Sequence, residues 1–166
     1  MIFNFKKHNF DLYSNILALS RNIFFYDKLR LKDNFENRIY LMFIHFSILL
    51  IIAKKKGTTF DQISYDTFFN CIENDLRESG LGDVSVNKKM KDINKILYDI
   101  LLKIDLSKKG DKSLKINSKL ILKYFQDLND INSSKYKNFE QYFISFYDFC
   151  FELPLNNMIR DLNKYK

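Results

Sequence analysis

A nearly unbroken apolar run, IYLMFIHFSILLIIA, occupies residues 39–53. It lies between Arg38 and three lysines at positions 54–56, and it carries His45 and Ser47 in its middle. A helix needs roughly 20 apolar residues to span a bilayer, and this run is shorter. Because the run is apolar on almost every side, other helices should surround it. It therefore predicts a central buried helix, and the membrane anchor of a peripheral protein is the alternative.

The composition favours helices over strands. One proline and four glycines occur in 166 residues, far fewer than hairpin-rich or sandwich folds need for their turns. Hydrophobic residues make up 46% and charged residues 28% of the chain, which argues against disorder and against a polytopic membrane protein. We therefore predict one all-α domain over residues 1–166, a bundle of about six to seven helices.

Apolar residues recur with the helical period along most of the chain. The predicted helices cover residues 11–29, 34–56, 58–80, 83–104, 114–128, 136–151 and 155–162, and a polar loop covers residues 107–113. Asp33 or Asn34 is expected to cap the second helix, with Glu36 reaching back to Asp33. Thr58 or Thr59 is expected to begin the third helix.

The segment DLRESGLGDVSVNKKMK, residues 75–91, joins the third and fourth predicted helices. Gly80 fits the left-handed position that closes a helix, Gly82 is a second permissive residue, and Asp83 is placed to cap the next helix. These three residues predict a tight helical hairpin. The flanking charges form a polarised rim that a turn does not need, and they are Asp75, Arg77, Glu78, Lys88, Lys89 and Lys91. Intrahelical ion pairs are the alternative explanation for them.

The same segment, with Tyr98 downstream, resembles the signature of the ubiquinol–cytochrome c chaperone family. The other positions that carry the resemblance are the block SRNIFFY at 20–26, then Arg38, Leu41 and His45, and then Gln62, Asp66 and Phe69. The resemblance is strongest over residues 11–105. Asn87 and the pair Asp99 and Ile100 depart from the family's pattern, and residues 114–166 match only as generic helical sequence.

The resemblance implies a helical, non-enzymatic assembly chaperone for the cytochrome bc1 complex, the ubiquinol–cytochrome c reductase of the respiratory chain. Its expected partner is newly made cytochrome b, another bc1 subunit or a further assembly factor. An apolar groove bordered by charge would hold a helix of the client. The resemblance also makes seven charged residues the expected partner-binding residues: Asp75, Arg77, Glu78, Asp83, Lys88, Lys89 and Lys91.

The sequence carries no motif for catalysis or for a cofactor. It lacks a phosphate-binding loop, a dinucleotide fingerprint, an HExxH pair and a nucleophile elbow. His8 is expected in an N-terminal arm and His45 in the core, without partners at catalytic or metal spacing. Cys71 and Cys150 are expected to be reduced core thiols. We therefore predict no catalytic residue, no cofactor and no metal ion.

The net charge of +7 and the isoelectric point near 9.2 favour acidic partners. An alternative function is therefore a basic helical module that binds RNA or the ribosome surface through the lysines at 54–56 and at 88–91. No recognised RNA-binding motif accompanies these lysines, and nothing points to specific DNA binding.

The N-terminal stretch MIFNFKKHNF lacks the apolar core and the cleavage site of a secretory signal. The expected location is therefore the bacterial cytoplasm, with peripheral contact to the inner membrane or the ribosome as an option. For an organellar protein, the expected location is the mitochondrial matrix.

Overall fold

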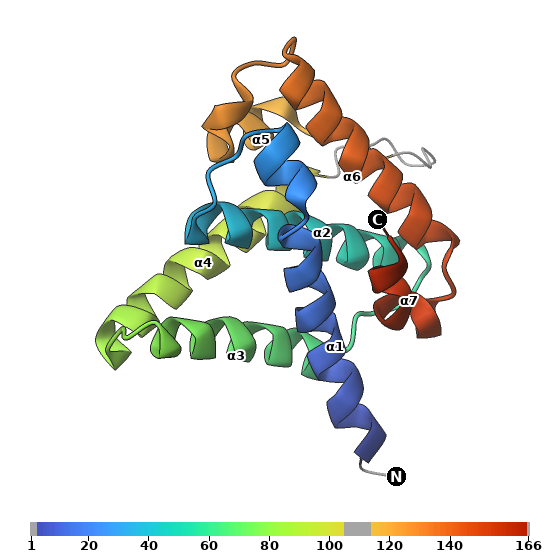
Figure 1. Ribbon diagram of the computed structural model, residues 1–166. Helices are drawn as coiled ribbons and strands as arrows, with labels where there is room; N and C mark the ends of the chain where they lie inside the picture. The colour runs from blue at the N-terminus through green and yellow to red at the C-terminus, as the bar shows by residue number, and fades with distance from the viewer. Residues whose placement is uncertain (1–2, 105–113, 166) are drawn as a thin grey trace.

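The computed structural model describes residues 3–104 and 114–165, which fold into an all-α bundle (Figure 1). Within these ranges there are seven α-helices and no strand, as the sequence predicts. The helices are α1 (Phe3–Ser20), α2 (Phe35–Lys55), α3 (Gln62–Glu78), α4 (Asp83–Ile104), α5 (Ser118–Tyr124), α6 (Ser134–Glu152) and α7 (Leu155–Asp161). Three shorter helical turns complete them: η1 (Phe24–Lys28), η2 (Gln126–Leu128) and η3 (Leu162–Lys164).

Helix α2 is the centre of the bundle, which confirms the prediction from the apolar run. It contacts α1, α4 and α6, and Figure 1 shows it crossing the middle of the molecule. Helix α2 is long and apolar enough to cross a membrane by length and composition, but 72% of its most apolar window is buried inside the bundle. Other helices therefore cover the apolar surface that lipid would otherwise have to cover.

The first helix ends earlier than predicted, at Ser20 instead of near Leu29. Two polar side chains hydrogen-bond to the local backbone at this point. Such bonds compete with the backbone hydrogen bonds that would continue the helix. The Ser20 hydroxyl donates to the Leu17 carbonyl at 2.7 Å, and the Asn22 side chain accepts from the Phe24 amide at 3.0 Å. The chain then turns into the π-helical turn η1.

The same helix begins earlier than predicted, at Phe3. Residues 3–10 contain neither glycine nor proline, so nothing in the sequence stops the helix before Asp11. His8 therefore lies within α1 and not in a separate N-terminal arm.

The caps of the next two helices agree with the sequence-based prediction in one case and differ from it in the other. Asn34 caps α2 by accepting from the Asn37 amide, whereas Glu36 pairs with Lys89 and does not reach back to Asp33. Helix α3 begins after Asp61, which accepts from the Ser64 amide, and not at Thr58 or Thr59.

The helix predicted at 114–128 is shorter than expected. Asn117 caps α5, and the last turn continues as the separate turn η2. The predicted helices at 136–151 and 155–162 correspond to α6 and α7. The loop predicted at residues 107–113 lies outside the described residues.

The core is rich in aromatic side chains that meet edge to face or stacked. Phe25 from η1 and Phe143 from α6 lie against His45 of α2, with ring centroids 6.2 and 4.8 Å from the imidazole. Both cysteines are free, as the sequence predicts, with Cys150 buried in this core. Cys71 is only partly buried, so it is not a core thiol in the full sense of the prediction.

Candidate functional site

A pocket of about 320 Å³ opens where α1, the first turns of α2 and the end of α3 meet. Its walls combine apolar side chains with charged groups at the rim. The apolar lining consists of Leu17, Phe35, Ile39, Met42 and Ile72, and the polar lining consists of Tyr13, Arg21, Arg38, Asp75, Glu78 and Ser79. Pockets that bind small molecules have volumes from roughly 300 Å³ upward, so this pocket lies at the small end of that range and can accept one or two side chains of a partner.

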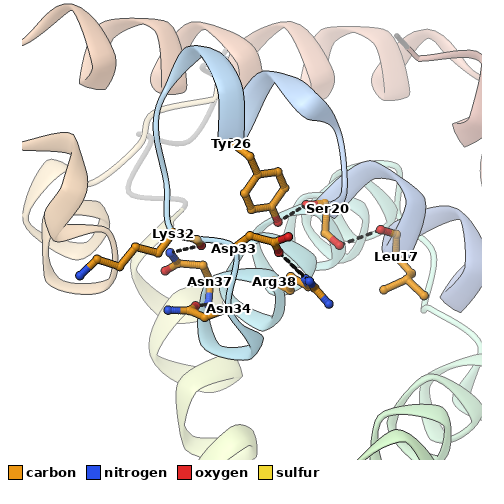
Figure 2. Close-up of polar contacts among 8 residues, drawn as sticks. All are labelled: Leu17, Ser20, Tyr26, Lys32, Asp33, Asn34, Asn37 and Arg38. Carbon is orange, nitrogen blue, oxygen red and sulfur yellow. Dashed lines mark hydrogen bonds and ion pairs between the residues drawn. The ribbon is translucent and has the colours of Figure 1, made fainter.

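The two arginines of the pocket lie at the two ends of the connection between α1 and α2. Figure 2 shows this connection and labels Arg38. Arg21 follows the last residue of α1 directly. Arg38 lies in the first turns of α2, and Asp33 holds its guanidinium with two hydrogen bonds of 2.8 and 2.6 Å. Both bonds go to one oxygen of the carboxylate, Oδ1, and they orient the guanidinium from one side.

Hydrogen bonds from side chains to backbone carbonyls hold the same connection in one conformation (Figure 2). The Tyr26 hydroxyl donates to the Ser20 carbonyl at 2.7 Å, so η1 is tied to the end of α1. The Asn37 side chain donates to the Lys32 carbonyl at 2.8 Å, which ties α2 to the residues before it. The pocket's basic wall is therefore built by a connection that is ordered by its own polar residues.

Helix α3 supplies the acidic wall of the pocket. The carboxylate of Asp75 accepts a hydrogen bond from the Tyr13 hydroxyl of α1. Burial raises the pKa of Tyr13 above its usual value, and the hydrogen bond to Asp75 raises it further, so the phenol stays protonated and keeps donating. Glu78, one turn further along α3, also lines the pocket. Positive charge from α1 and α2 thus faces negative charge from α3.

The structure divides the charged rim predicted at residues 75–91 into three parts. Asp75 and Glu78 line the pocket. Arg77 points elsewhere, to Glu73 of its own helix at 2.5 Å and to Asp83 of α4 at 3.4 Å. Both of these ion pairs lie at the solvent-exposed hairpin, where such pairs contribute little to stability.

The lysines of the predicted rim lie on α4 and do not line the pocket themselves, although Lys89 contacts Phe35, which does. Lys89 pairs with Glu36 of α2 at 3.4 Å and lies 5.6 Å from the centre of the Phe35 ring. Lys88 and Lys91 are exposed, and within the described ranges neither has an acidic partner. Of the seven predicted residues, only Asp75 and Glu78 therefore line the pocket, and Lys89 reaches its edge through Phe35.

The hairpin between α3 and α4 depends on one of its two glycines. Gly80 has a φ of +94°, the left-handed conformation predicted for it. Gly82 does not need a positive φ. Asp83 is the first residue of α4 and not its cap, because its carboxylate pairs with Arg77 instead.

Three pocket residues, Tyr13, Arg21 and Arg38, were not among the partner-binding residues predicted from sequence. Arg21 and Arg38 belong to the elements that carry the family resemblance, so the sequence could have marked them as candidate binding residues. Tyr13 lies in an ordinary helical repeat and gave no signal. Only the packing of α1 against α3 places its hydroxyl beside Asp75.

The buried histidine of α2, His45, does not line the pocket. His45 is fully buried, with Nδ1 donating to the Leu41 carbonyl at 2.7 Å and Nε2 accepting from the Tyr142 hydroxyl at 3.1 Å. It is the satisfied core histidine that the sequence predicts. Across the described ranges, no group of three or more histidine, cysteine, aspartate or glutamate residues could hold a metal ion.

A family model described as ubiquinol-cytochrome C chaperone matches residues 27–120, more than half of the chain. The matched residues run from the end of η1 through α2, α3 and α4 into α5. They include Arg38, Asp75 and Glu78 of the pocket, whereas Tyr13 and Arg21 precede them. No curated protein and no solved structure matches the chain.

Proposed function

The chain belongs to the ubiquinol-cytochrome C chaperone family, and on that premise we propose that it promotes assembly of the cytochrome bc1 complex by binding newly made cytochrome b. The family indicates a chaperone whose partner is a component of a respiratory complex, and it suggests a non-enzymatic role. Cytochrome b as the client, and the bacterial cytoplasm or the mitochondrial matrix as the location, are parts of the proposal.

The pocket between α1, α2 and α3 is the observation that carries this proposal. Its apolar lining can bury a large side chain of an unassembled membrane protein, which has no other cover until its partner subunits join. The arginines on one wall and the acids on the other bind polar groups that flank such a side chain. Charge of both signs also excludes clients of the wrong polarity.

The proposal is tested by exchanging the two charges at the pocket rim. In the variant with Arg21→Glu and Glu78→Lys, the net charge and the apolar lining are unchanged, but each wall of the pocket now carries charges of both signs, because Arg38 and Asp75 stay in place. Both side chains are exposed, so the fold should tolerate the change. The matched control is Lys32→Glu with Glu152→Lys, two exposed residues outside the pocket.

Each variant should be returned to a strain from which the gene has been deleted. We expect the deletion to lower cytochrome b and bc1 activity selectively, and we expect the control variant to restore both. The pocket variant should restore cytochrome b about tenfold less well, which corresponds to a loss of about 1.4 kcal/mol in client binding. Normal bc1 levels in the deletion strain would reject the function, and full restoration by the pocket variant would reject the site.

A further inference from the structure

The outward-facing side of α4 combines exposed lysines with exposed apolar residues. Six residues spaced alternately by four and three fall on one line along the helix: Val84, Lys88, Lys91, Lys95, Tyr98 and Leu102. The residues of α4 that are buried lie on the opposite side, and they are Val86, Ile93, Leu97, Ile100 and Ile104. We call the six-residue line the α4 outer face.

The apolar residues of the α4 outer face are unusually exposed. Val84 is 85% exposed, Leu102 is 73% exposed and Tyr98 is 54% exposed, although the helix has an ample buried side for such residues. Val84 lies at one end of the line, while Tyr98 and Leu102 lie at the other. A solvated helix face needs none of them, whereas a face that meets an apolar phase gains from burying them.

The lysines of this face carry charge that the molecule itself leaves available. Among the described residues, Lys88 and Lys91 have no acidic partner, and Lys95 has only a loose one, Asp92 at 3.5 Å. The nearby acid Asp99 is occupied, because it pairs with Lys103 and Lys123. The outer face therefore presents a positive potential between its two apolar ends.

A groove of about 530 Å³ continues the α4 outer face at its C-terminal end. The end of α2 forms its other side, and Leu102 belongs both to the groove and to the outer face. The groove is lined by Leu50, Ile51, Lys54, Lys55, Leu101 and Leu102. Apolar walls beside Lys54 can receive an acyl chain while the ammonium group remains at the level of the headgroups. The ammonium group of Lys55 contacts Tyr147 of α6 instead.

We propose that the α4 outer face and this groove dock on the surface of a bilayer that contains anionic phospholipids. Each lysine near such a surface strengthens binding about fivefold, and exposed aliphatic residues add the burial of their side chains below the headgroups. RNA would satisfy the lysines equally well, but it offers no apolar phase for Val84 and Leu102. The combination of residues therefore favours lipid.

This inference goes beyond the proposed function and does not depend on the identity of the client. The pocket between α1, α2 and α3 contains no residue of α4, so both surfaces can be occupied together. Docking through α4 would hold the client pocket close to the membrane in which a client such as cytochrome b is inserted.

The lysines are tested by sedimenting the purified chain with lipid vesicles. We expect binding to vesicles that contain phosphatidylglycerol, weakening as salt is raised, and none to vesicles of phosphatidylcholine alone. Replacing Lys88, Lys91 and Lys95 with glutamine should weaken binding about 100-fold. The matched control replaces three exposed lysines elsewhere, Lys32, Lys119 and Lys137, and should weaken binding only several-fold. Equal losses in the two variants would reject a specific docking face.

The role of the apolar residues of the α4 outer face is tested with tryptophan fluorescence. The chain contains no tryptophan, so a single introduced tryptophan reports on its own position. In the variant Leu102→Trp, the emission should shift to shorter wavelength on addition of phosphatidylglycerol vesicles. The control Ile23→Trp changes a residue that is 75% exposed and directly precedes η1, and its emission should not shift. No shift at position 102, or lysine-dependent binding to RNA without binding to vesicles, would overturn the proposal.

Discussion

His45 illustrates how burial sets the chemistry of a single residue. Its imidazole is fully buried among Phe25, Phe143 and Phe146, and both ring nitrogens have partners. Removal from water lowers its pKa from 6.5 to about 4, although the hydrogen bond to the Leu41 carbonyl acts in the opposite direction. The folded protein therefore holds His45 neutral under conditions in which the unfolded chain would protonate it.

This shift predicts a loss of stability in mild acid. Above pH 6.5 the imidazole is neutral in both states, so it gives no pH dependence. As the pH falls from 6.5 towards 4, only the unfolded state gains the proton and stability falls. Between about pH 7.5 and about pH 5, His45 should account for a loss of about 2 kcal/mol in the free energy of unfolding.

Urea denaturation at several pH values checks this prediction. The variant His45→Gln carries a side chain that does not titrate, so its stability should change less over the same pH range, whatever its absolute value. Parallel pH profiles for the wild type and the variant would show that His45 titrates normally in the folded state.

The sequence could predict His45 in the core because its neighbours in the chain are apolar. It could not predict which charges of residues 75–91 would share a surface. That outcome depends on the angle between α3 and α4, which sends Asp75 to the pocket and Lys91 to the outer side of the bundle. Local spacing contains no information about that angle.

At the scale of the elements, the hairpin between α3 and α4 depends on the backbone of Gly80. A side chain at a φ of +94° is strained even though no neighbouring atom would touch an added Cβ. We expect Gly80→Ala to lower the free energy of unfolding by about 1 kcal/mol. Gly82→Ala is the control, and it should be close to neutral because Gly82 has neither a positive φ nor a close neighbour. Chemical denaturation measures both, and equal effects would mean that the turn does not require the left-handed conformation.

Asp99 joins α4 to α5 through a cluster of hydrogen bonds. It pairs with Lys103 of its own helix, and it accepts from Lys123 at 2.7 Å and from the Tyr124 hydroxyl at 2.6 Å. These hydrogen bonds, that from Lys103 first, hold the pKa of the carboxyl well below its usual value. The stabilisation is therefore present above pH 4 and decreases as the pH falls below it.

We expect Asp99→Asn to destabilise the fold by about 1 to 2 kcal/mol, because an amide replaces a carboxylate that two cations contact. The control Asp92→Asn removes a charge from the same helix, where the only pair is the exposed one with Lys95. It should cost less than about 0.5 kcal/mol. Thermal or urea unfolding of the two variants at neutral pH makes the comparison, and similar losses would deny Asp99 a role in holding α5.

Helix interiors were predictable from sequence, but several helix ends were not. The apolar period identified α3, α4 and α6, since each buries a continuous stripe, and the unbroken apolar run identified α2, which is buried on almost every side. Ends depend on competition between neighbouring polar residues that look equivalent in sequence. Asp61 caps α3 in place of Thr58 or Thr59, and Ser20 with Asn22 ends α1 within an apolar repeat.

At the scale of the whole molecule, the bundle places two different surfaces around one apolar helix. One face has a small apolar pocket with charges of both signs, and another has lysines beside exposed aliphatic residues. The proposal that cytochrome b binds in the pocket rests on the family to which the chain belongs. The all-α fold followed from composition, whereas the division into two surfaces required the arrangement of α1, α3 and α4 around α2.

Affinity purification of the tagged protein from detergent-solubilised membranes tests the central claim most directly. If the pocket holds newly made cytochrome b, cytochrome b should co-elute with the wild type and with the control variant Lys32→Glu, Glu152→Lys. About tenfold less should co-elute with the pocket variant Arg21→Glu, Glu78→Lys. Absence of cytochrome b from the wild-type eluate, or equal amounts with the two variants, would contradict the account.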